Sequence, residues 1–336
     1  MKTISTIFPE KEKIIFLEEK ISDPSLDEVL IKTTRTLIST GTEIAILSGR
    51  HTHHLQGKKD SWAKFPWHAG YINVGTIIKK GHNVMDFKEG DRILSTCSHS
   101  TYVKSNIKDI VKIPDNVSDE EATFGIICGI VFPAIKVSKI SIGDSVAVIG
   151  LGLLGQLTTQ FCKLDGAVPV IGVDLSDLRL DLARKNGCEV LLNPERVDLE
   201  KEVKNLTYGL GVDIAFEVTG VPKVFPQVLK LPRREGKVIL LSSPHGTVEM
   251  DLYSDIHARG LTIIGQGSGT HIPKEEEISN RWTINNIRKF SLNLIGNNYI
   301  KVKNLISHRF NWREIDKAYS MLMKDRGSAM GVIIEW

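Results

Sequence analysis

The sequence contains little cysteine, and no arrangement of cysteines that indicates a disulfide framework or a structural zinc site. Its 336 residues include four cysteines, which are widely spaced, and no C-x-x-C pair occurs. Because clustered or closely paired cysteines mark disulfide-rich domains and zinc knots, their absence predicts isolated buried thiols. The four are Cys97, Cys128, Cys162 and Cys188.

The chain also lacks a strong net charge and a long apolar run. Lysine and arginine total 43 against 40 acidic residues, for a net charge of +3, and no block of like charges suggests a nucleic-acid-binding arm. The most apolar stretch, near Phe124 to Ile135, is shorter than a membrane span, and the N-terminal residues lack the apolar core of a signal peptide. We therefore expect a cytoplasmic protein with no nucleic-acid or membrane partner.

What the sequence does contain is a complete dinucleotide-binding pattern between residues 145 and 174. An apolar run is followed by G-x-G-x-x-G, a helix-like segment and a second apolar run that ends in an acid. The first glycine permits a tight turn, the second lets the backbone approach a pyrophosphate, and the third lets helix and strand pack closely. The helix N-terminus then offers N–H groups to the phosphates. The predicted cradle consists of Gly150, Gly152, Leu153, Leu154 and Gly155.

Asp174 stands where this pattern places the residue that selects between NAD and NADP. A carboxylate accepts hydrogen bonds from the ribose hydroxyls and repels a 2′-phosphate, so NAD is the predicted cofactor. Arg179, one helical turn further along, is interpreted as a surface helix residue and not as a phosphate clamp.

Two kinds of pattern divide the chain, whose length suggests about two domains. Up to about Asp115, short extended runs alternate with turn residues, which favours a β-rich, barrel-like domain. After Asp174, strand and helix patterns alternate, which predicts a doubly wound parallel sheet. The run from Ala329 to Ile334 is a strand that could return to the first domain. We expect an α/β protein with residues 1–120 and 275–336 in one domain and 121–274 in the other.

Four further motifs lie outside the dinucleotide pattern. They are F-K-E-G-D-R-I at 87–93, G-D at 143–144, F-E-V-T-G at 216–220, and I-S-H-R-F followed by E-I-D-K-A-Y between 306 and 319. In content and order they resemble the medium-chain dehydrogenase/reductase superfamily. The resemblance implies a GroES-like catalytic domain, an inserted Rossmann domain, an active site in the cleft between them, and a homodimer or homotetramer that often pairs through the last Rossmann strands. It also implies that the nicotinamide half of the cofactor lies along Thr219, Ser242, Gly265 and Gln266.

The chain departs from that family at the positions of the catalytic zinc ligands. By the resemblance, Thr40 replaces a cysteine, Tyr71 replaces a histidine, and the third ligand aligns near Ile126. None of these side chains is an ordinary zinc ligand, so no metal site is expected. A shifted alignment that uses Cys128 and His68 is the alternative, and it still lacks a third ligand.

Hydride transfer without zinc needs another group to move the hydroxyl proton. By the resemblance, Thr40, Thr42, Glu43 and Tyr71 surround the reacting centre. Tyr71 is the first candidate for proton donor or acceptor and Glu43 the second; a packing aromatic and an ordering hydrogen bond are the structural alternatives. Thr42 aligns with a relay hydroxyl, but Ala45 replaces the relay histidine.

The run R-H-T-H-H at 50–54 and the aromatic residues after it suggest a substrate pocket. Adjacent histidines cannot easily face one metal ion, so we interpret the segment as a loop that borders the substrate cleft. A hydrophobic plug under a long loop is the alternative for the aromatic residues. The candidate pocket residues are His51, His54 and Trp67.

These observations predict a zinc-independent, NAD(H)-dependent oxidoreductase that interconverts a secondary alcohol and a ketone in a sugar-like or secondary-metabolite small molecule. The S-T-G-T-E run at 39–43, with G-Y at 70–71, resembles the bacteriochlorophyllide a dehydrogenase-like branch of the family, without indicating a tetrapyrrole substrate. One alternative is an NADPH-dependent quinone or enoyl reductase, against which Asp174 argues. The other is a catalytically inactive nucleotide-binding protein.

Overall fold

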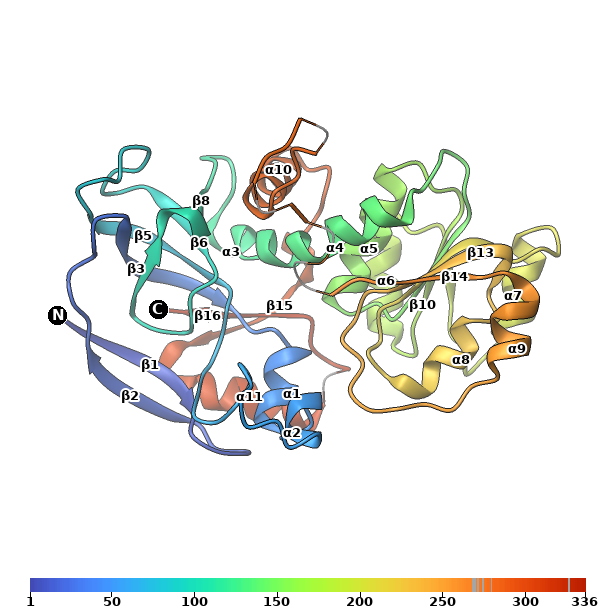
Figure 1. Cartoon of the computed structure of the whole chain (residues 1–336), viewed down its shortest axis with the longest axis horizontal. Helices are drawn as coiled ribbons and strands as arrows, with labels where there is room; N and C mark the ends of the chain where they lie inside the picture. Colours follow the sequence, from blue (N-terminus) through green and yellow to red (C-terminus); the bar gives the residue numbers. More distant parts are fainter. Residues whose placement is uncertain (268–269, 271, 274, 279, 326) are drawn as a thin grey trace. The chain divides into compact units, whose positions relative to one another are not determined.

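The computed structural model describes residues 1–336 except 268–269, 271, 274, 279 and 326 (Figure 1). The chain forms two compact units, one of residues 1–127 with 273–336 and one of residues 128–272. The first division falls inside helix α4 (Phe124–Ser138), a few residues after the boundary expected from the sequence. The second lies beside the expected boundary at Lys274, which is itself outside the described residues.

Two β-sheets form the first unit. In the described part of the chain, a seven-stranded sheet runs in the order β15-β16-β3-β5-β6-β8 with β7 paired to β3, and a three-stranded sheet runs β2-β1-β4. Its strands are β1 (Lys2–Phe8), β2 (Ile15–Lys20), β3 (Glu28–Leu37), β4 (Trp67–His68), β5 (Asn73–Lys80), β6 (Arg92–Ser95), β7 (Tyr102–Asn106), β8 (Ile110–Lys112), β15 (Ile306–Asn311) and β16 (Gly331–Glu335). Its helices are α1 (Thr42–Leu47), α2 (Thr52–Leu55), α3 (Asp119–Ala122), α10 (Ile284–Gly296) and α11 (Ile315–Lys324).

The C-terminal strand β16 returns to the first unit, as the sequence predicts. It pairs antiparallel with β3, with Ile334 opposite Thr36, and parallel with β15. The side chains of α1, α11 and β16 share one apolar core, in which Phe8, Ile44 and Tyr319 are fully buried. The C-terminal segment is therefore an integral part of this unit.

The second unit contains a parallel sheet in the strand order β11-β10-β9-β12-β13-β14. Counted along the chain, this is the 3-2-1-4-5-6 order of dinucleotide-binding sheets, and it reverses between β9 and β12. Strands β9 and β10 are buried along their whole length, as apolar runs in parallel sheets should be. The strands are β9 (Val146–Ile149), β10 (Val170–Val173), β11 (Val190–Leu192), β12 (Val212–Glu217), β13 (Pro232–Leu240) and β14 (Thr262–Gly265). The helices are α5 (Leu153–Leu164), α6 (Asp177–Lys185), α7 (Leu199–Leu206), α8 (Phe225–Val228) and α9 (Leu252–Asp255).

The helical segment 119–138 is long and apolar enough to cross a membrane by length and composition. In the structure, 78% of its apolar window is buried. Burial in a protein core accounts for this composition without a membrane, and no other helix among the described residues meets the same test.

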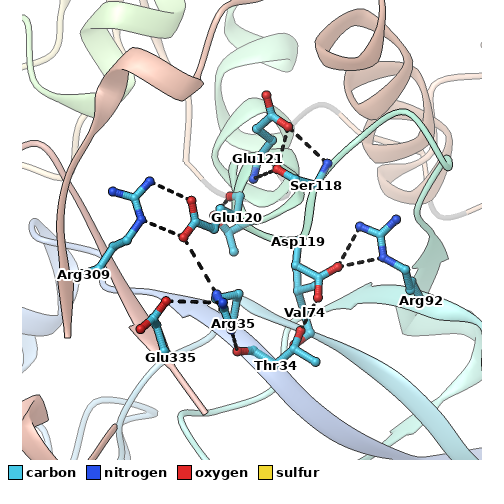
Figure 2. Close-up of polar contacts among 11 residues, drawn as sticks. Thr34, Arg35, Val74, Arg92, Ser118, Asp119, Glu120, Glu121, Arg309 and Glu335 are labelled. Atoms are coloured by element: carbon cyan, nitrogen blue, oxygen red, sulfur yellow. Dashed lines mark hydrogen bonds and ion pairs between the residues drawn. The ribbon is translucent and has the colours of Figure 1, made fainter. Parts of the chain in front are cut away.

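An ion-pair network joins α3 to three strands of the first unit (Figure 2). Glu120 accepts hydrogen bonds from Arg309 Nε and Nη2, both at 2.8 Å, and its Oε1 lies 3.9 Å from Arg35 Nε. Arg35 Nη2 in turn lies 3.3 Å from Glu335. The network ties β3, β15 and β16 to the segment that leads into α4, so it links the two ends of this unit's chain.

The neighbouring residue Asp119 connects α3 to the same sheet through a second set of contacts (Figure 2). It accepts hydrogen bonds from Arg92 Nε at 2.8 Å and from Thr34 Oγ1 at 2.6 Å. Ser118 and Glu121 form a capping box that starts the helix. The short helix is thus fixed at both its cap and its acidic first turn.

Substituting Glu120→Gln should lower the free energy of unfolding at pH 7 by about 1 kcal/mol, because a partly buried bidentate pair is lost. Hydrogen bonds from Arg309 lower the pKa of Glu120 below its usual 4.5, so its contribution is present above that pH and is lost as the pH falls through the lowered pKa. Urea unfolding at pH 7 and at about pH 3 measures both effects. Glu314→Gln, which removes an exposed pair with Lys317, is the control. An equal decrease in the free energy of unfolding in Glu120→Gln and Glu314→Gln would contradict a stabilising role for the network.

Candidate active site

The glycine turn after β9 has the geometry of a dinucleotide cradle. Gly150 has φ +96°, and a Cβ there would lie 2.9 Å from the backbone nitrogen of Thr219. A Cβ on Gly155 would lie 1.8 Å from the carbonyl oxygen of Gly150, so helix and turn are in close contact. A Cβ on Gly152 would meet nothing within 4 Å, which leaves its backbone open to a ligand. Leu153 and Leu154 form the first turn of α5 directly behind it. The residues present fit a nicotinamide dinucleotide.

Asp174 follows β10 and is hydrogen-bonded to the glycine turn. Its Oδ2 accepts from the Leu151 N–H at 2.7 Å, and its Oδ1 accepts from the Ser176 N–H at 2.8 Å. Each carboxylate oxygen has a second lone pair that a ribose hydroxyl can use. Arg179 Nη1 lies 3.6 Å from Oδ2, with 22% of its side chain exposed. Arg179 is therefore a direct neighbour of the carboxylate, which the interpretation as a surface residue did not foresee.

The four residues assigned to the nicotinamide half all follow strands on the other side of the point where the sheet order reverses. Thr219 comes after β12 and Ser242 after β13. Gly265 ends β14, and Gln266 donates from its backbone nitrogen to Leu240 at 2.9 Å. The carboxyl ends of parallel strands share one edge of a sheet, so these residues lie along the same edge as Asp174.

In the first unit, the hydroxyl of Tyr71 lies within a small cluster of hydroxyl groups. It is 2.5 Å from Ser39 Oγ and 3.4 Å from Thr42 Oγ1. Burial raises the pKa of Tyr71, and the nearby charge of Glu43 acts in the same direction. The phenol therefore keeps its proton at neutral pH and can donate it. Thr40, the residue after Ser39 in the chain, is half-buried.

Glu43 is fully buried and accepts hydrogen bonds from three separate segments. Its Oε1 accepts from the Ser39 N–H at 2.7 Å, and its Oε2 accepts from His99 Nε2 at 3.1 Å and from the Tyr319 hydroxyl. A carboxylate can only accept, so His99 carries its proton on Nε2. Burial and the Glu43 charge raise the pKa of Tyr319, which stays protonated. Glu43 thereby orders the loop that carries Ser39.

Sequence reasoning missed Ser39, His99 and Tyr319 as members of this site. Ser39 lies inside the S-T-G-T-E run and could have been found there, but His99 and Tyr319 are 56 and 276 residues from Glu43 in the chain. One local signal exists for His99. Gly70 has φ +89°, and a Cβ there would lie 2.6 Å from the His99 ring. The glycine before Tyr71 is therefore needed to accommodate the histidine.

The histidine-rich segment forms the short helix α2 and not the predicted loop, with His51 at its N-cap, and packing and local hydrogen bonds hold it. His51 is 7% exposed and its ring lies 5.1 Å from that of Trp62. His54 Nε2 is 2.6 Å from a backbone oxygen, and its ring stacks on Phe65 at 4.7 Å. Trp67 lies in the apolar core beside Phe8, with ring centroids 5.5 Å apart. These contacts match the alternative in which the aromatic residues plug the space under a loop.

The positions aligned with zinc ligands do not form a metal site. Ile126 is an apolar core residue, and among the described residues no three histidine, cysteine or acidic side chains are placed to hold a metal ion. Burial raises the pKa of Cys128 to about 12, and His68 is exposed, so the shifted alignment supplies one buried thiol and one exposed imidazole. The side chains present do not fit a catalytic zinc ion.

Similarity to known proteins supports an oxidoreductase that uses a nicotinamide cofactor. Residues 154–283 match the family described as zinc-binding dehydrogenase, a range that excludes positions 40, 71 and 126. The chain is 28% identical to an L-threonine 3-dehydrogenase of Bacillus licheniformis, with 91% of this chain and 92% of the relative covered.

Solved structures share the fold over the whole length of the chain. An Escherichia coli oxidoreductase/dehydrogenase of unknown specificity has a TM-score of 0.86 at 21% identity and covers 100% of this chain and 99% of its own. A putative zinc-binding dehydrogenase of Sinorhizobium meliloti bound to NADP has a TM-score of 0.82 at 21% identity, with 100% of both chains covered. These similarities support the resemblance to the medium-chain dehydrogenase/reductase superfamily, and the solved structures share its combination of GroES-like and Rossmann folds.

Substituting Tyr319→Phe should lower the free energy of unfolding by about 1.5–3 kcal/mol, because a buried carboxylate loses one of its hydrogen-bond donors. Urea unfolding measures the change. Tyr299→Phe, which alters a tyrosine that is 63% exposed, is the matched control and should be near neutral. A Tyr319→Phe variant as stable as the wild type would show that the hydroxyl contributes nothing to Glu43.

Proposed function

We propose that the protein is a zinc-independent, NAD(H)-dependent oxidoreductase that interconverts a secondary alcohol and a ketone in a sugar-like or secondary-metabolite substrate. The observation that carries this proposal is the Tyr71 hydroxyl, held by Ser39 and Thr42 at a position where the family resemblance places a zinc ligand. A protonated phenol supplies the proton-moving group that hydride transfer requires. The relatives named L-threonine 3-dehydrogenase are named for the oxidation of a secondary alcohol, which supports the substrate class.

Because its pKa is raised, Tyr71 is protonated at neutral pH, and this favours the reductive direction of the reaction. The bound nicotinamide supplies or accepts the hydride. In the reductive direction, the Tyr71 hydroxyl donates its proton to the carbonyl oxygen, while the Ser39 hydroxyl holds the phenol in place. In the oxidative direction Tyr71 must first lose its proton, which requires alkaline pH.

Asp174 supports NAD over NADP in this proposal. Its carboxylate would lie beside a 2′-phosphate and repel it, although one similar structure is that of a protein bound to NADP. An NADPH-dependent quinone or enoyl reductase is the second candidate, which Arg179 beside Asp174 favours, since arginine is the usual partner of a 2′-phosphate. A cytoplasmic homodimer or homotetramer completes the proposal, with the exposed edge strand β14 as the pairing edge.

The Tyr71→Phe substitution tests the role of the phenol. The substrates are panels of ketones derived from polyols, nucleotide sugars and L-threonine. With NADH, protein treated with a chelator should reduce them at the same rate as untreated protein. Tyr71→Phe should lower kcat by about 10²–10⁴-fold and leave the Kd for NADH unchanged. Wild-type reduction should stay constant up to about pH 10, whereas alcohol oxidation should rise with pH over the same range.

Other outcomes of this assay separate the alternatives. Activity lost on chelation would overturn zinc independence, and an unchanged kcat in Tyr71→Phe would overturn its role. Reduction of activated alkenes by NADPH would support the reductase alternative. NADH binding without turnover of any substrate would support the third alternative, a catalytically inactive nucleotide-binding protein.

Substituting Asp174→Ser should change the cofactor preference. Removal of the carboxylate takes away the ribose acceptor and the repulsion of a 2′-phosphate, while Arg179 remains to contact that phosphate. The Kd for NADH should rise about tenfold, and that for NADPH should fall, as measured by fluorescence titration. The Asp177→Ser variant, which alters an exposed acid in the same segment, is the control. A wild type that already prefers NADPH would contradict the assignment of NAD.

A further inference from the structure

Glu217 is a buried acid at the carboxyl end of β12 that no step of the proposed reaction uses. Its side chain is 1% exposed. Its Oε1 accepts hydrogen bonds from the Thr219 N–H at 2.7 Å, from the Thr219 hydroxyl, and from the Gly220 N–H at 3.2 Å. Its Oε2 accepts from Ser242 Oγ at 2.5 Å. One carboxylate therefore holds the loops that follow two neighbouring strands, β12 and β13.

The same loops contact the glycine turn of the dinucleotide cradle. A Cβ at Gly150 would lie 2.9 Å from both the backbone nitrogen and the Cγ2 of Thr219. The Thr219 hydroxyl also accepts from the Val221 N–H at 3.0 Å, which fixes the loop further along. Because Thr219 is positioned by Glu217, the shape of the cradle on this side depends on a residue that is itself out of reach of a ligand.

The strand order indicates which part of a dinucleotide meets these loops. The order reverses between β9 and β12, and a dinucleotide lies across this point with one mononucleotide on each side. Asp174, after β10, is on the side that reads the adenosine ribose. The loops after β12 and β13 are on the opposite side, where the nicotinamide mononucleotide must lie.

We propose that Glu217 is a positioning residue for the nicotinamide half of the cofactor, acting through Thr219 and Ser242; the inference rests on the cofactor of the proposed function. Hydrogen bonds to a carboxylate are stronger than those between neutral groups, so Glu217 fixes both loops before the cofactor binds. A loop already held in its bound shape loses less freedom on binding, and the cofactor binds more tightly. The adenosine half has its own contacts and gains nothing from Glu217.

The Glu217→Gln variant of the full-length protein tests this inference. One side-chain oxygen becomes an NH₂ group, which cannot accept a bond from Ser242 or from the Thr219 loop. Fluorescence titration should show a Kd for NADH about tenfold higher than in the wild type, as expected for one lost hydrogen bond to a charged group. Displacement titration with ADP-ribose, which lacks the nicotinamide, should show a change of less than about twofold.

Asp213→Asn is the matched control, because Asp213 is an acid near the other end of β12. Its Oδ2 accepts from the backbone and hydroxyl of Ser145, both at 2.8 Å, and its Oδ1 accepts from Arg233 at 2.7 Å. This variant should lose stability in urea without changing the binding of NADH relative to ADP-ribose. Should Glu217→Gln fail to fold, Ser242→Ala removes one bond to the carboxylate and should weaken NADH binding selectively by a smaller factor.

Two outcomes would overturn the inference: unchanged NADH binding in Glu217→Gln and Ser242→Ala, or an equal loss of NADH and ADP-ribose binding. A wild type that binds neither ligand would overturn it together with the cofactor assignment. A wild type that binds NADH but turns over no substrate would overturn the proposed reaction. In that case, a loss of NADH binding without a loss of ADP-ribose binding in Glu217→Gln would still support the positioning role.

Discussion

The hydrogen bonds to the buried carboxylate of Glu43 are the interaction on which the first unit depends most. An ionised acid out of contact with water is tolerated only when enough donors replace the water it has lost. The donors come from the loop after β3, from His99 and from Tyr319 of α11. A C-terminal helix is thereby bonded to the N-terminal loop that carries the candidate catalytic hydroxyls, so the unit needs both ends of the chain to form its site.

The second unit uses the same principle for a different purpose. Glu217 is as inaccessible as Glu43, but its donors lie on two loops at the edge of a parallel sheet. Asp174, at the same edge, keeps 8% of its side chain exposed and spare lone pairs. The two inaccessible acids, Glu43 and Glu217, therefore hold loops in place, whereas the more accessible Asp174 can contact a ligand.

The parts of the fold that can be predicted from the sequence are those that depend on residues close together in the chain. The glycine turn and the buried runs of β9 and β10 could be predicted because each depends on residues within a short stretch of chain. The strand predicted at the C-terminal end does return to the first unit, but its pairing with β3 could not be read from that stretch. His99 and Tyr319 could not be predicted, because the residues around them give no sign of a carboxylate that lies 56 and 276 residues away in the chain. Arg179 was misjudged for a related reason, since helical spacing alone does not show that α6 turns it toward Asp174.

The proposed function does without a metal ion, and the hydrogen bonds to Glu43 support that proposal. In zinc sites an acid commonly orients a histidine ligand, and the cation balances its charge. Here Glu43 accepts hydrogen bonds from Ser39, from Tyr319 and from His99, whose ring lies beside Gly70. Burial, with the nearby charge of Glu43 acting in the same direction, raises the pKa of the Tyr71 phenol and keeps its proton in place. In the proposed reaction, Tyr71 therefore acts at neutral pH as a proton donor to a carbonyl oxygen.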